Sequence, residues 1–210
     1  MIILGTCQLQ TAEAISGLSD HLFGGLILTK TLETERLFLR PPLREDFEPW
    51  AKMLTDAQAT QFIGGVQDAH GAWRNLALFA GSWTINGFSN FSVIEKSTGK
   101  WVGRVGPWQP EGWPGAEIGW SLDTAAWGKG YATEAAAACI DWVFDELGWD
   151  KVLHVIAPEN KASIAVAQRL GSLYIGPGQL PPPSENIKVD LYGQSRQQWS
   201  ERAKNKRSAA

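Results

Sequence analysis

The chain has 210 residues, 44% of them hydrophobic and 20% charged, so its composition is that of a globular protein with a core large enough to be stable without cross-links. Its formal net charge of −3 argues against a nucleic-acid-binding protein, which needs a clustered basic excess. No apolar run reaches the ~18 residues of a membrane span, and residues 1–30 are not typical of a signal peptide.

Two cysteines, Cys7 and Cys139, cannot form a disulfide framework. Cys139 falls on the apolar stripe of an expected helix and is predicted to be buried. A reducing, cytoplasmic location fits this cysteine usage.

The first half of the chain predicts strands and helices in alternation. Residues 1–30 show no sustained period, and we expect a loosely attached extension there, followed by one domain over 31–200 and a tail over 201–210. Alternation predicts a first strand over 35–40, stopped by Pro41. Apolar spacing predicts helices over 44–55 and 69–85, the second ended by Gly87.

Further strands are predicted over 88–95 and 100–108, joined as a hairpin by residues 96–99. A strand over 116–122 follows. Its alternation places Ile118, Trp120 and Leu122 on one face, and Glu117 on the other face together with Gly119 and Ser121.

The second half begins with a glycine turn and a long alanine-rich helix that Gly148 is expected to close as a C′ glycine. Residues 151–157 are nearly all apolar, as in a strand covered on both faces and parallel to its predecessor. A helix over 160–170 ends at Gly171. Two late strands, near Leu173 and over 187–193, flank the rigid loop 181–183, and a solvated helix is expected over 196–207.

These elements predict an α/β or α+β fold. The central strand, helix, strand and helix make one right-handed crossover unit, with antiparallel strands before and after it. In such a sheet the ligand site lies at the carboxyl end of the central strands.

The turn 127–130 is the most informative segment. Gly128 and Gly130 have no Cβ, so an anion can approach the backbone, and Lys129 adds a positive charge between them. The helix that follows leaves its first N–H groups without partners, and its dipole adds positive potential. The spacing fits neither a P-loop nor a dinucleotide fingerprint. A phosphate-binding turn and an ordinary helix start both remain open at this point.

Several ordered segments resemble the GNAT acyltransferase superfamily, most nearly its ribosomal-protein-type N-acetyltransferases. Each segment is common alone, but their order and spacing are specific. They run from Leu32 to Trp199: 32–40, 116–120, 127–135, 160–163 and 167–171. The resemblance implies a single GNAT-like domain with a mixed, mostly antiparallel sheet, in which helices flank a central, splayed parallel strand pair.

The resemblance also implies acetyl-CoA as co-substrate. In the family, the backbone amides of such a turn hold the CoA pyrophosphate, and the pantetheine arm pairs with the edge of the splayed strand. Trp127 departs from the usual Gln or Arg, as the ribosomal-protein-type branch often does. The cofactor-binding residues implied here are Leu122, Trp127, Gly128, Lys129, Gly130, Tyr131, Ala132, Thr133, Asn160 and Ser163. For Asn160 a plain helix cap, and for Ser163 a surface hydroxyl, are the structural alternatives.

Acetyl transfer to an amine needs a base, because a lysine-type amine of pKa ~10.4 costs about 4.6 kcal/mol to deprotonate at pH 7. Glu117 is one candidate, by resemblance to family members with a glutamate on this strand, and a solvent-facing carboxylate is its alternative. His154 is the other, with a core histidine as its alternative. By resemblance, Ser163 lies near the coenzyme sulfur and assists the thiol leaving group, and Tyr174 or Tyr192 could replace it. Three scattered histidines suggest no metal site.

We therefore expect an N-acetyltransferase that moves an acetyl group from acetyl-CoA to a primary amine by direct transfer in a ternary complex. A non-catalytic CoA-binding module and a general phosphate-ligand binder are the alternatives. The acceptor channel is expected beside Trp108, Trp113 and the loop 181–183, whose walls suit a small-molecule amine and a peptide α-amine equally. No nucleic acid or membrane partner is expected, and dimers are common in the family.

Overall fold

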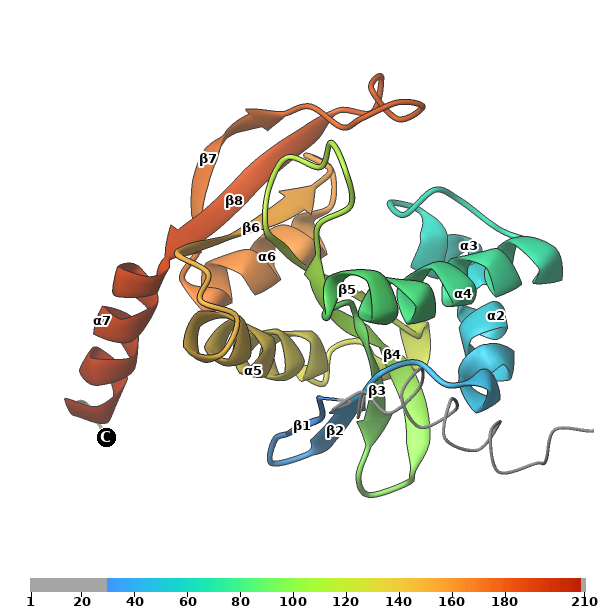
Figure 1. The fold of residues 1–210 in the computed structure, drawn as a ribbon, viewed down its shortest axis with the longest axis horizontal. Coiled ribbons are helices and arrows are strands. Elements are labelled where there is room, and N and C mark those ends of the chain that lie inside the picture. Colours follow the sequence, from blue (N-terminus) through green and yellow to red (C-terminus); the bar gives the residue numbers. More distant parts are fainter. Residues whose placement is uncertain (1–29, 209–210) are drawn as a thin grey trace, which may run out of the picture.

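A computed structural model describes residues 30–208 of the protein, and Figure 1 shows their arrangement. The extension expected over residues 1–30 therefore lies almost wholly outside the described residues. The elements in chain order are β1 (Leu32–Glu33), β2 (Leu37–Arg40), η1 (Arg44–Asp46), α2 (Phe47–Thr55), α3 (Ala57–Thr60), α4 (Ala69–Asn86), β3 (Phe91–Glu95), β4 (Lys100–Trp108), β5 (Glu117–Leu122), η2 (Thr124–Ala126), α5 (Tyr131–Asp145), β6 (Lys151–Ile156), α6 (Lys161–Leu170), β7 (Leu173–Gly178), β8 (Val189–Ser195) and α7 (Arg196–Ser208).

The strands form one sheet in the order β1-β2-β3-β4-β5-β6-β8-β7. Every neighbouring pair is antiparallel except β5 and β6, which are parallel. The predicted mixed, mostly antiparallel sheet with one central parallel pair is therefore confirmed.

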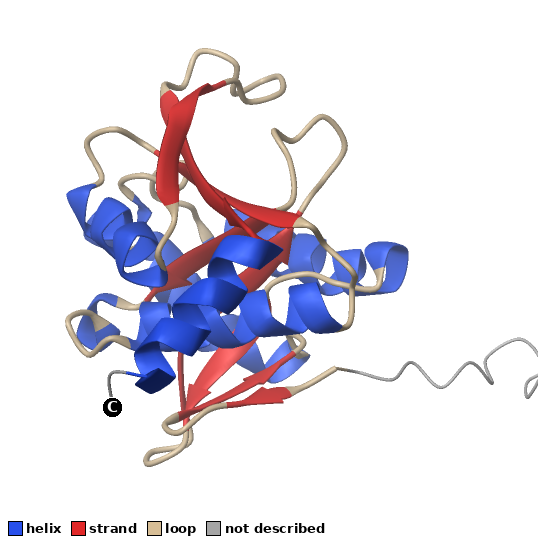
Figure 2. Ribbon diagram, turned by 90° about the vertical axis from the view of Figure 1, so that its left-hand side faces the viewer, coloured by secondary structure: helices blue, strands red, loops and turns tan. Residues whose placement is uncertain are grey.

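Helices cover both faces of the sheet (Figure 2). On one face, Ala135, Cys139 and Ile140 of α5 pack on strand residues such as Val105 and Ile118. On the other face, Trp50 of α2 and Phe79 of α4 pack with one another and with Trp101 and Trp108 of β4. We call the second face the α2/α4 face. Burial of Cys139 agrees with its expected place on the apolar stripe.

Local sequence explains where the helices begin and end. The Asp68 side chain accepts a hydrogen bond from Gly71 N at 2.7 Å at the start of α4, and Gly87 ends that helix in the left-handed region at φ 74°. Asn160 caps α6 in the same way, and Gly171 ends it at φ 89°.

The two central strands separate soon after they meet. β5 and β6 share a single register pair, Glu117 with Leu153, whereas β5 pairs with β4 over six residues. The splay implied by the family resemblance is therefore present, and it opens the middle of the sheet toward the carboxyl ends of both strands.

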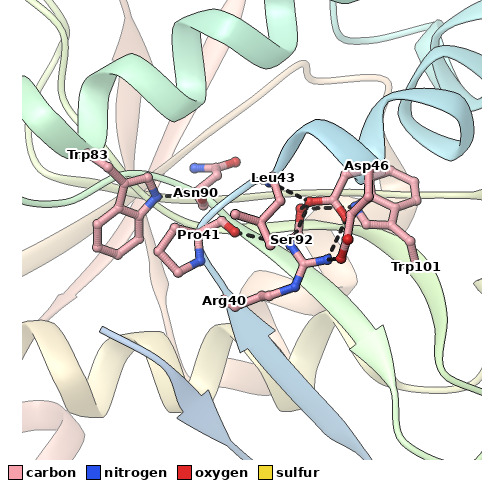
Figure 3. A network of polar contacts seen from close by, with 9 residues as sticks. Arg40, Pro41, Leu43, Asp46, Trp83, Asn90, Ser92 and Trp101 are labelled. Carbon is pink, nitrogen blue, oxygen red and sulfur yellow. Dashed lines mark hydrogen bonds and ion pairs between the residues drawn. The ribbon is translucent and has the colours of Figure 1, made fainter. Parts of the chain in front are cut away.

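A buried polar network ties the first helical segment to the sheet on the α2/α4 face (Figure 3). The Asp46 carboxylate, 2% exposed, accepts two hydrogen bonds of 2.7 Å from the guanidinium of Arg40. It also accepts one from Ser92 Oγ at 2.7 Å and one from Leu43 N at 2.8 Å. Because each carboxylate oxygen has partners, the buried charge is compensated.

Some boundaries differ from those expected. The helix expected over 44–55 is split into η1 and α2, the strand expected from 88 begins at Phe91, and the short β1 and α3 were not predicted. The placement of Gly148 as the C′ residue of α5 was wrong, because the helix already ends at Asp145 with Glu146 as its C-cap. Gly148 lies two residues past the cap at φ 71°, and the next amide, Trp149 N, closes the turn on Val143 O at 3.1 Å.

Among the described residues, no helix is both long enough and apolar enough to cross a bilayer.

Candidate active site

The turn 127–130 is exposed to solvent, and hydrogen bonds to the preceding residues fix its conformation. Both glycines have positive φ, 75° at Gly128 and 81° at Gly130, which other residues rarely adopt. Trp127 N donates to Thr124 O at 3.1 Å, and the indole Nε1 of Trp127 donates to Leu122 O at 2.9 Å. The indole therefore anchors the turn to the end of β5.

The backbone amides at this turn are free of protein acceptors. Over residues 30–208, no hydrogen bond is recorded from the backbone N–H groups of residues 128–133, while Glu134 N is the first amide to bond back into the helix, to Gly130 O at 3.1 Å. These six residues comprise Gly128, Lys129, Gly130, Tyr131, Ala132 and Thr133. Those of Tyr131, Ala132 and Thr133 belong to the first turn of α5, where the helix dipole adds positive potential.

Two residues from the start of the domain hold this turn against the sheet. Arg36 Nη1 donates to Lys129 O at 2.9 Å, and Arg36 Nε donates to the Glu134 carboxylate at 2.7 Å. Glu134 also accepts from Thr34 Oγ1 at 2.6 Å and from Arg36 N at 2.9 Å. Periodicity could not reveal these contacts, because they join positions about a hundred residues apart.

Two positively charged side chains, Lys129 and Arg36, lie at the turn. The Lys129 ammonium lies 3.8 Å from Glu95 Oε1, and the Tyr131 hydroxyl donates to the same carboxylate. Lys129 and Arg36 also lie near the Tyr131 ring, at 5.7 Å and 4.8 Å from its centroid. The side chains around the turn thus include two cations that an anion could reach.

Glu117 lies where β5 and β6 part, on the α2/α4 face. Its carboxylate accepts from Val155 N of β6 at 3.3 Å and from Trp113 Nε1 at 2.6 Å. The side chain thus takes the place of the ladder hydrogen bond that β6 loses as the strands separate. Glu117 is 8% exposed, so the solvent-facing alternative considered for it was wrong.

Burial sets the protonation of Glu117. Removal of the carboxylate from water raises its pKa to about 7, although hydrogen bonds from Val155 N and Trp113 and the charge of Arg104 act in the opposite direction. The group is therefore close to half-ionised near neutral pH.

His154 bridges the same split on the opposite face of the sheet. Its Nδ1 lies 2.7 Å from Ile118 O of β5, and its Nε2 lies 2.9 Å from Ser172 Oγ. Since a carbonyl can only accept, Nδ1 carries the hydrogen and Nε2 accepts from the Ser172 hydroxyl. Burial lowers the pKa of His154 to about 4, so the ring is neutral.

Asn160 and Ser163 stand beside the end of the split. The Asn160 side-chain oxygen accepts from Ser163 N at 3.0 Å and caps α6. The Ser163 hydroxyl accepts from Trp120 Nε1 at 3.1 Å, and Trp120 in turn packs on His154 with 4.9 Å between ring centroids. The oxygen of Asn160 is committed to the helix cap, which leaves its NH₂ group for other contacts.

Arg104 of β4 is a site residue that sequence reasoning missed. It pairs in register with Ser121, and facing residues of an antiparallel pair share a face, so Arg104 lies on the α2/α4 face with Glu117. Its Nη1 donates to Asn90 Oδ1 at 2.7 Å. The one available signal was a cation in the middle of an apolar strand, four residues before Trp108 and therefore on the same face as Trp108 and its partner Glu117.

The expected walls of the acceptor channel lie near Glu117. Trp108 is the register partner of Glu117 on β4, and Trp113 is bonded to its carboxylate. A Cβ built on Gly112 would lie 3.3 Å from Pro181, so the loop 109–116 touches the loop 181–183. Tyr174 is 57% exposed and packs edge-on against Tyr192 at 5.6 Å, farther along the sheet on β7 and β8.

The chain is similar in sequence to known acetyltransferases. Residues 36–172 match the family model of the acetyltransferase (GNAT) domain. The uncharacterized N-acetyltransferase p20 of Bacillus licheniformis is 33% identical over 145 residues, which cover 67% of this chain and 81% of that protein. The protein YkkB of Bacillus subtilis is 42% identical over 90 residues, 42% of this chain and 52% of its own length, so that match spans about half of the relative.

Solved structures share the fold. An acetyltransferase from Agrobacterium tumefaciens superimposes with a TM-score of 0.70 at 30% identity, over 80% of this chain and 95% of that one. A ribosomal-protein-S5-alanine acetyltransferase from Vibrio fischeri has the same fold, with a TM-score of 0.64 at 20% identity over 81% and 98% of the two chains. With the family model covering more than half of its length, this chain belongs to the GNAT acetyltransferase family.

Proposed function

We propose that this acetyltransferase takes its acetyl group from acetyl-CoA and transfers it directly to a primary amine. The observation that carries the proposal is the row of six unbonded backbone amides over residues 128–133, at the start of α5. Six donors with no protein acceptor, an exposed turn and a helix dipole suit a diphosphate. Hydrogen bonds to a charged group contribute roughly 1.5–3 kcal/mol each, so a few of them would anchor the coenzyme.

The pantetheine arm of the coenzyme would lie in the split between β5 and β6. Beyond the one register pair, the facing edge of β5 toward Leu122 has no β6 partner. Ile118 O and Leu122 O already accept from His154 and Trp127, so the backbone groups of Trp120 between them would pair with the amides of such an arm. The NH₂ group of Asn160 and the hydroxyl of Ser163 stand at the far side of this split, within reach of an arm that follows it.

Glu117 is the base in this proposal. The acceptor enters as an ammonium, and Glu117 removes its proton before the nitrogen attacks the thioester carbon. The C–N bond then forms and the C–S bond breaks. A base works best when its pKa is near the working pH, and the pKa of about 7 that burial gives Glu117 meets this condition.

The leaving thiolate needs little assistance, because a thiol has a pKa of ~8.5. The nitrogen loses its second proton to solvent as the amide forms. We propose that Ser163 relays a proton from solvent to the sulfur, so that its hydroxyl is restored; this hydroxyl accepts from Trp120, so its own hydrogen can point toward the sulfur. Tyr174 and Tyr192 lie on β7 and β8 and stay the alternatives. His154 is better suited to position the strands, since both of its ring nitrogens are engaged inside the sheet.

Calorimetric titration with acetyl-CoA tests the coenzyme site. The wild-type protein should bind acetyl-CoA with a dissociation constant well below 1 mM, and absence of binding at millimolar coenzyme would refute the proposal. Gly130→Asp and Gly130→Asn form a matched pair. Both side chains cap a helix and tolerate left-handed φ, but only Asp puts a negative charge on the amides. Asp should weaken binding at least ten times more than Asn.

A further inference from the structure

We infer that Arg104 binds an oxyanion on the acceptor, so that the preferred acceptor is a small primary amine that also carries a carboxylate or a phosphate. This inference rests on the proposed function and narrows its substrate class. The amine end would lie at Glu117 and the anionic end at Arg104, on the same face of the sheet.

The guanidinium of Arg104 is not satisfied by the protein. Its Nη1 is bonded to Asn90, but its Nε is buried without a hydrogen-bond partner. Among residues 30–208, no carboxylate lies within 4.0 Å of it, whereas Arg36 and Arg40 each pair closely with one. A buried charged donor without an acceptor is costly, and an oxyanion from outside would remove that cost.

Aromatic packing does not supply the missing acceptor. The Phe79 ring lies 4.2 Å from the guanidinium carbon and the Trp50 ring 6.0 Å. A ring face offers no lone pair that could satisfy the N–H donors in the guanidinium plane. An oxyanion would supply that acceptor, and a carboxylate or a phosphate can take two of these donors at once.

Two facing glycines lie between Arg104 and Glu117 on the sheet. Gly106 of β4 is the register partner of Gly119 of β5, midway between the Arg104–Ser121 pair and the Trp108–Glu117 pair. A Cβ built on Gly119 would meet only the side chain of Glu117 within 4 Å, with Oε1 at 3.4 Å. The two glycines themselves therefore put no side chain between base and cation, and this part of the surface is bordered by Asn90, which donates to Gly106 O at 3.0 Å, and by the Phe79 ring, 4.6 Å from the Trp108 ring.

The spacing selects a small ligand. Arg104 and the residue opposite Glu117 are four positions apart on β4, roughly 13 Å at about 3.3 Å per residue, and both side chains shorten that gap. The carboxylate of Glu117 and the guanidinium also interact electrostatically. A molecule with an ammonium at one end and an oxyanion at the other complements this pair of charges, and a short aliphatic chain joins them.

The test uses unbranched amines that differ only at the far end: ω-aminocarboxylates, the ω-aminophosphonates of equal length, and the corresponding neutral amides. The rate of CoA release with acetyl-CoA gives kcat/KM for each. We expect the wild-type protein to prefer an oxyanion over the amide of equal length at least tenfold, and comparison of the first two series identifies which oxyanion it prefers. Equal values for all three would overturn the inference.

Arg104→Met should reduce the ratio of kcat/KM for the oxyanion to kcat/KM for the amide to below threefold. Arg104→Lys, which keeps the positive charge but lacks the paired N–H donors of the guanidinium, should give an intermediate ratio. Arg74→Met, on the exposed surface of α4, is the matched control and should keep the wild-type ratio. Acetyl-CoA affinity measured by calorimetry checks that each variant is folded. An unchanged ratio in Arg104→Met would contradict the inference.

Failure of the proposed function has a different signature. Calorimetry with the preferred aminocarboxylate, on protein saturated with CoA, reports binding without turnover. Binding that weakens at least tenfold in Arg104→Met, with no transfer to any amine, would support the anion site and refute the proposed reaction. Transfer to every amine without preference would refute the anion site alone.

Discussion

At the scale of single residues, Glu117 illustrates how environment decides chemistry. Strand alternation places it on the same face as Gly119 and Ser121, but alternation alone does not show whether that face is buried or exposed to solvent. In the folded protein the side chain accepts from Val155 N and Trp113 Nε1 and is almost fully buried. Burial, which disfavours the charged form, makes an ordinary carboxylate into a group that gains and loses its proton near neutral pH.

Glu117→Gln should lower kcat/KM by about 10²- to 10⁴-fold, the usual contribution of a general base. In the wild-type protein, kcat/KM should rise with pH through about 7, because a base acts only after it has lost its own proton. The glutamine variant should lack this rise. Steady-state rates between pH 5.5 and 9 measure both effects.

Glu111→Gln, an exposed position in the loop next to Trp113, is the control and should leave the pH profile unchanged. A glutamine at position 117 that preserved both the rate and the rise near pH 7 would remove Glu117 from the mechanism.

At the scale of elements, the separation of β5 and β6 defines the site. The apolar run 151–157 indicated a strand parallel to its predecessor, and the family resemblance implied the splay. What keeps the strands apart without losing hydrogen bonds is a pair of side chains. Glu117 accepts from Val155 N on one face, and His154 donates to Ile118 O on the other. Each replaces a backbone partner, so the split costs little in unpaired polar groups.

His154→Phe should destabilise the protein by about 2–4 kcal/mol, because Ile118 O and Ser172 Oγ both lose a buried partner. Urea denaturation monitored by tryptophan fluorescence measures the loss. The rise of kcat/KM through pH 7 should persist in the variant, because the proton belongs to Glu117.

The exposed His70 of α4 provides the matching control. His70→Phe should change stability by no more than about 0.5 kcal/mol. Disappearance of the rise near pH 7 in His154→Phe would instead identify His154 as the base.

At the scale of the whole molecule, the α2/α4 layer must be held firmly on the sheet, because its Trp50 and Phe79 pack beside Arg104. The network around Asp46 fastens this layer (Figure 3). Arg40 comes from β2, Asp46 from η1 and Ser92 from β3, and Trp101 of β4 donates to Ser92 Oγ at 3.1 Å. Four elements thus join in one network, three of them at the Asp46 carboxylate itself.

Arg40→Met should cost about 3–5 kcal/mol of stability, since it leaves the buried Asp46 carboxylate without its cation. Glu45→Gln removes only the exposed partner of Arg40, and should cost less than about 1 kcal/mol. Thermal or urea unfolding of both variants at pH 7 measures the difference. Equal losses in the two would show that the buried pair contributes no more than the surface one.

The sequence by itself determined the order and kind of most elements, the glycine turn before α5 and the family. These depend on periodicity, on glycine and on cap residues, which are read within a few neighbouring positions. The cap Asn160 could be identified in this way, whereas the base candidate Glu117 came from the family resemblance. The assignment of catalytic and coenzyme-binding residues stays a prediction that the experiments above test.

Only the tertiary structure decided which of these residues share an environment. It places Glu117 and His154 on opposite faces of the sheet, brings Arg36 and Thr34 to Glu134, and leaves Arg104 without an anion. The physical reason is that burial, charge pairing and the absence of a partner arise from residues far apart in the chain, so no local pattern in the sequence encodes them.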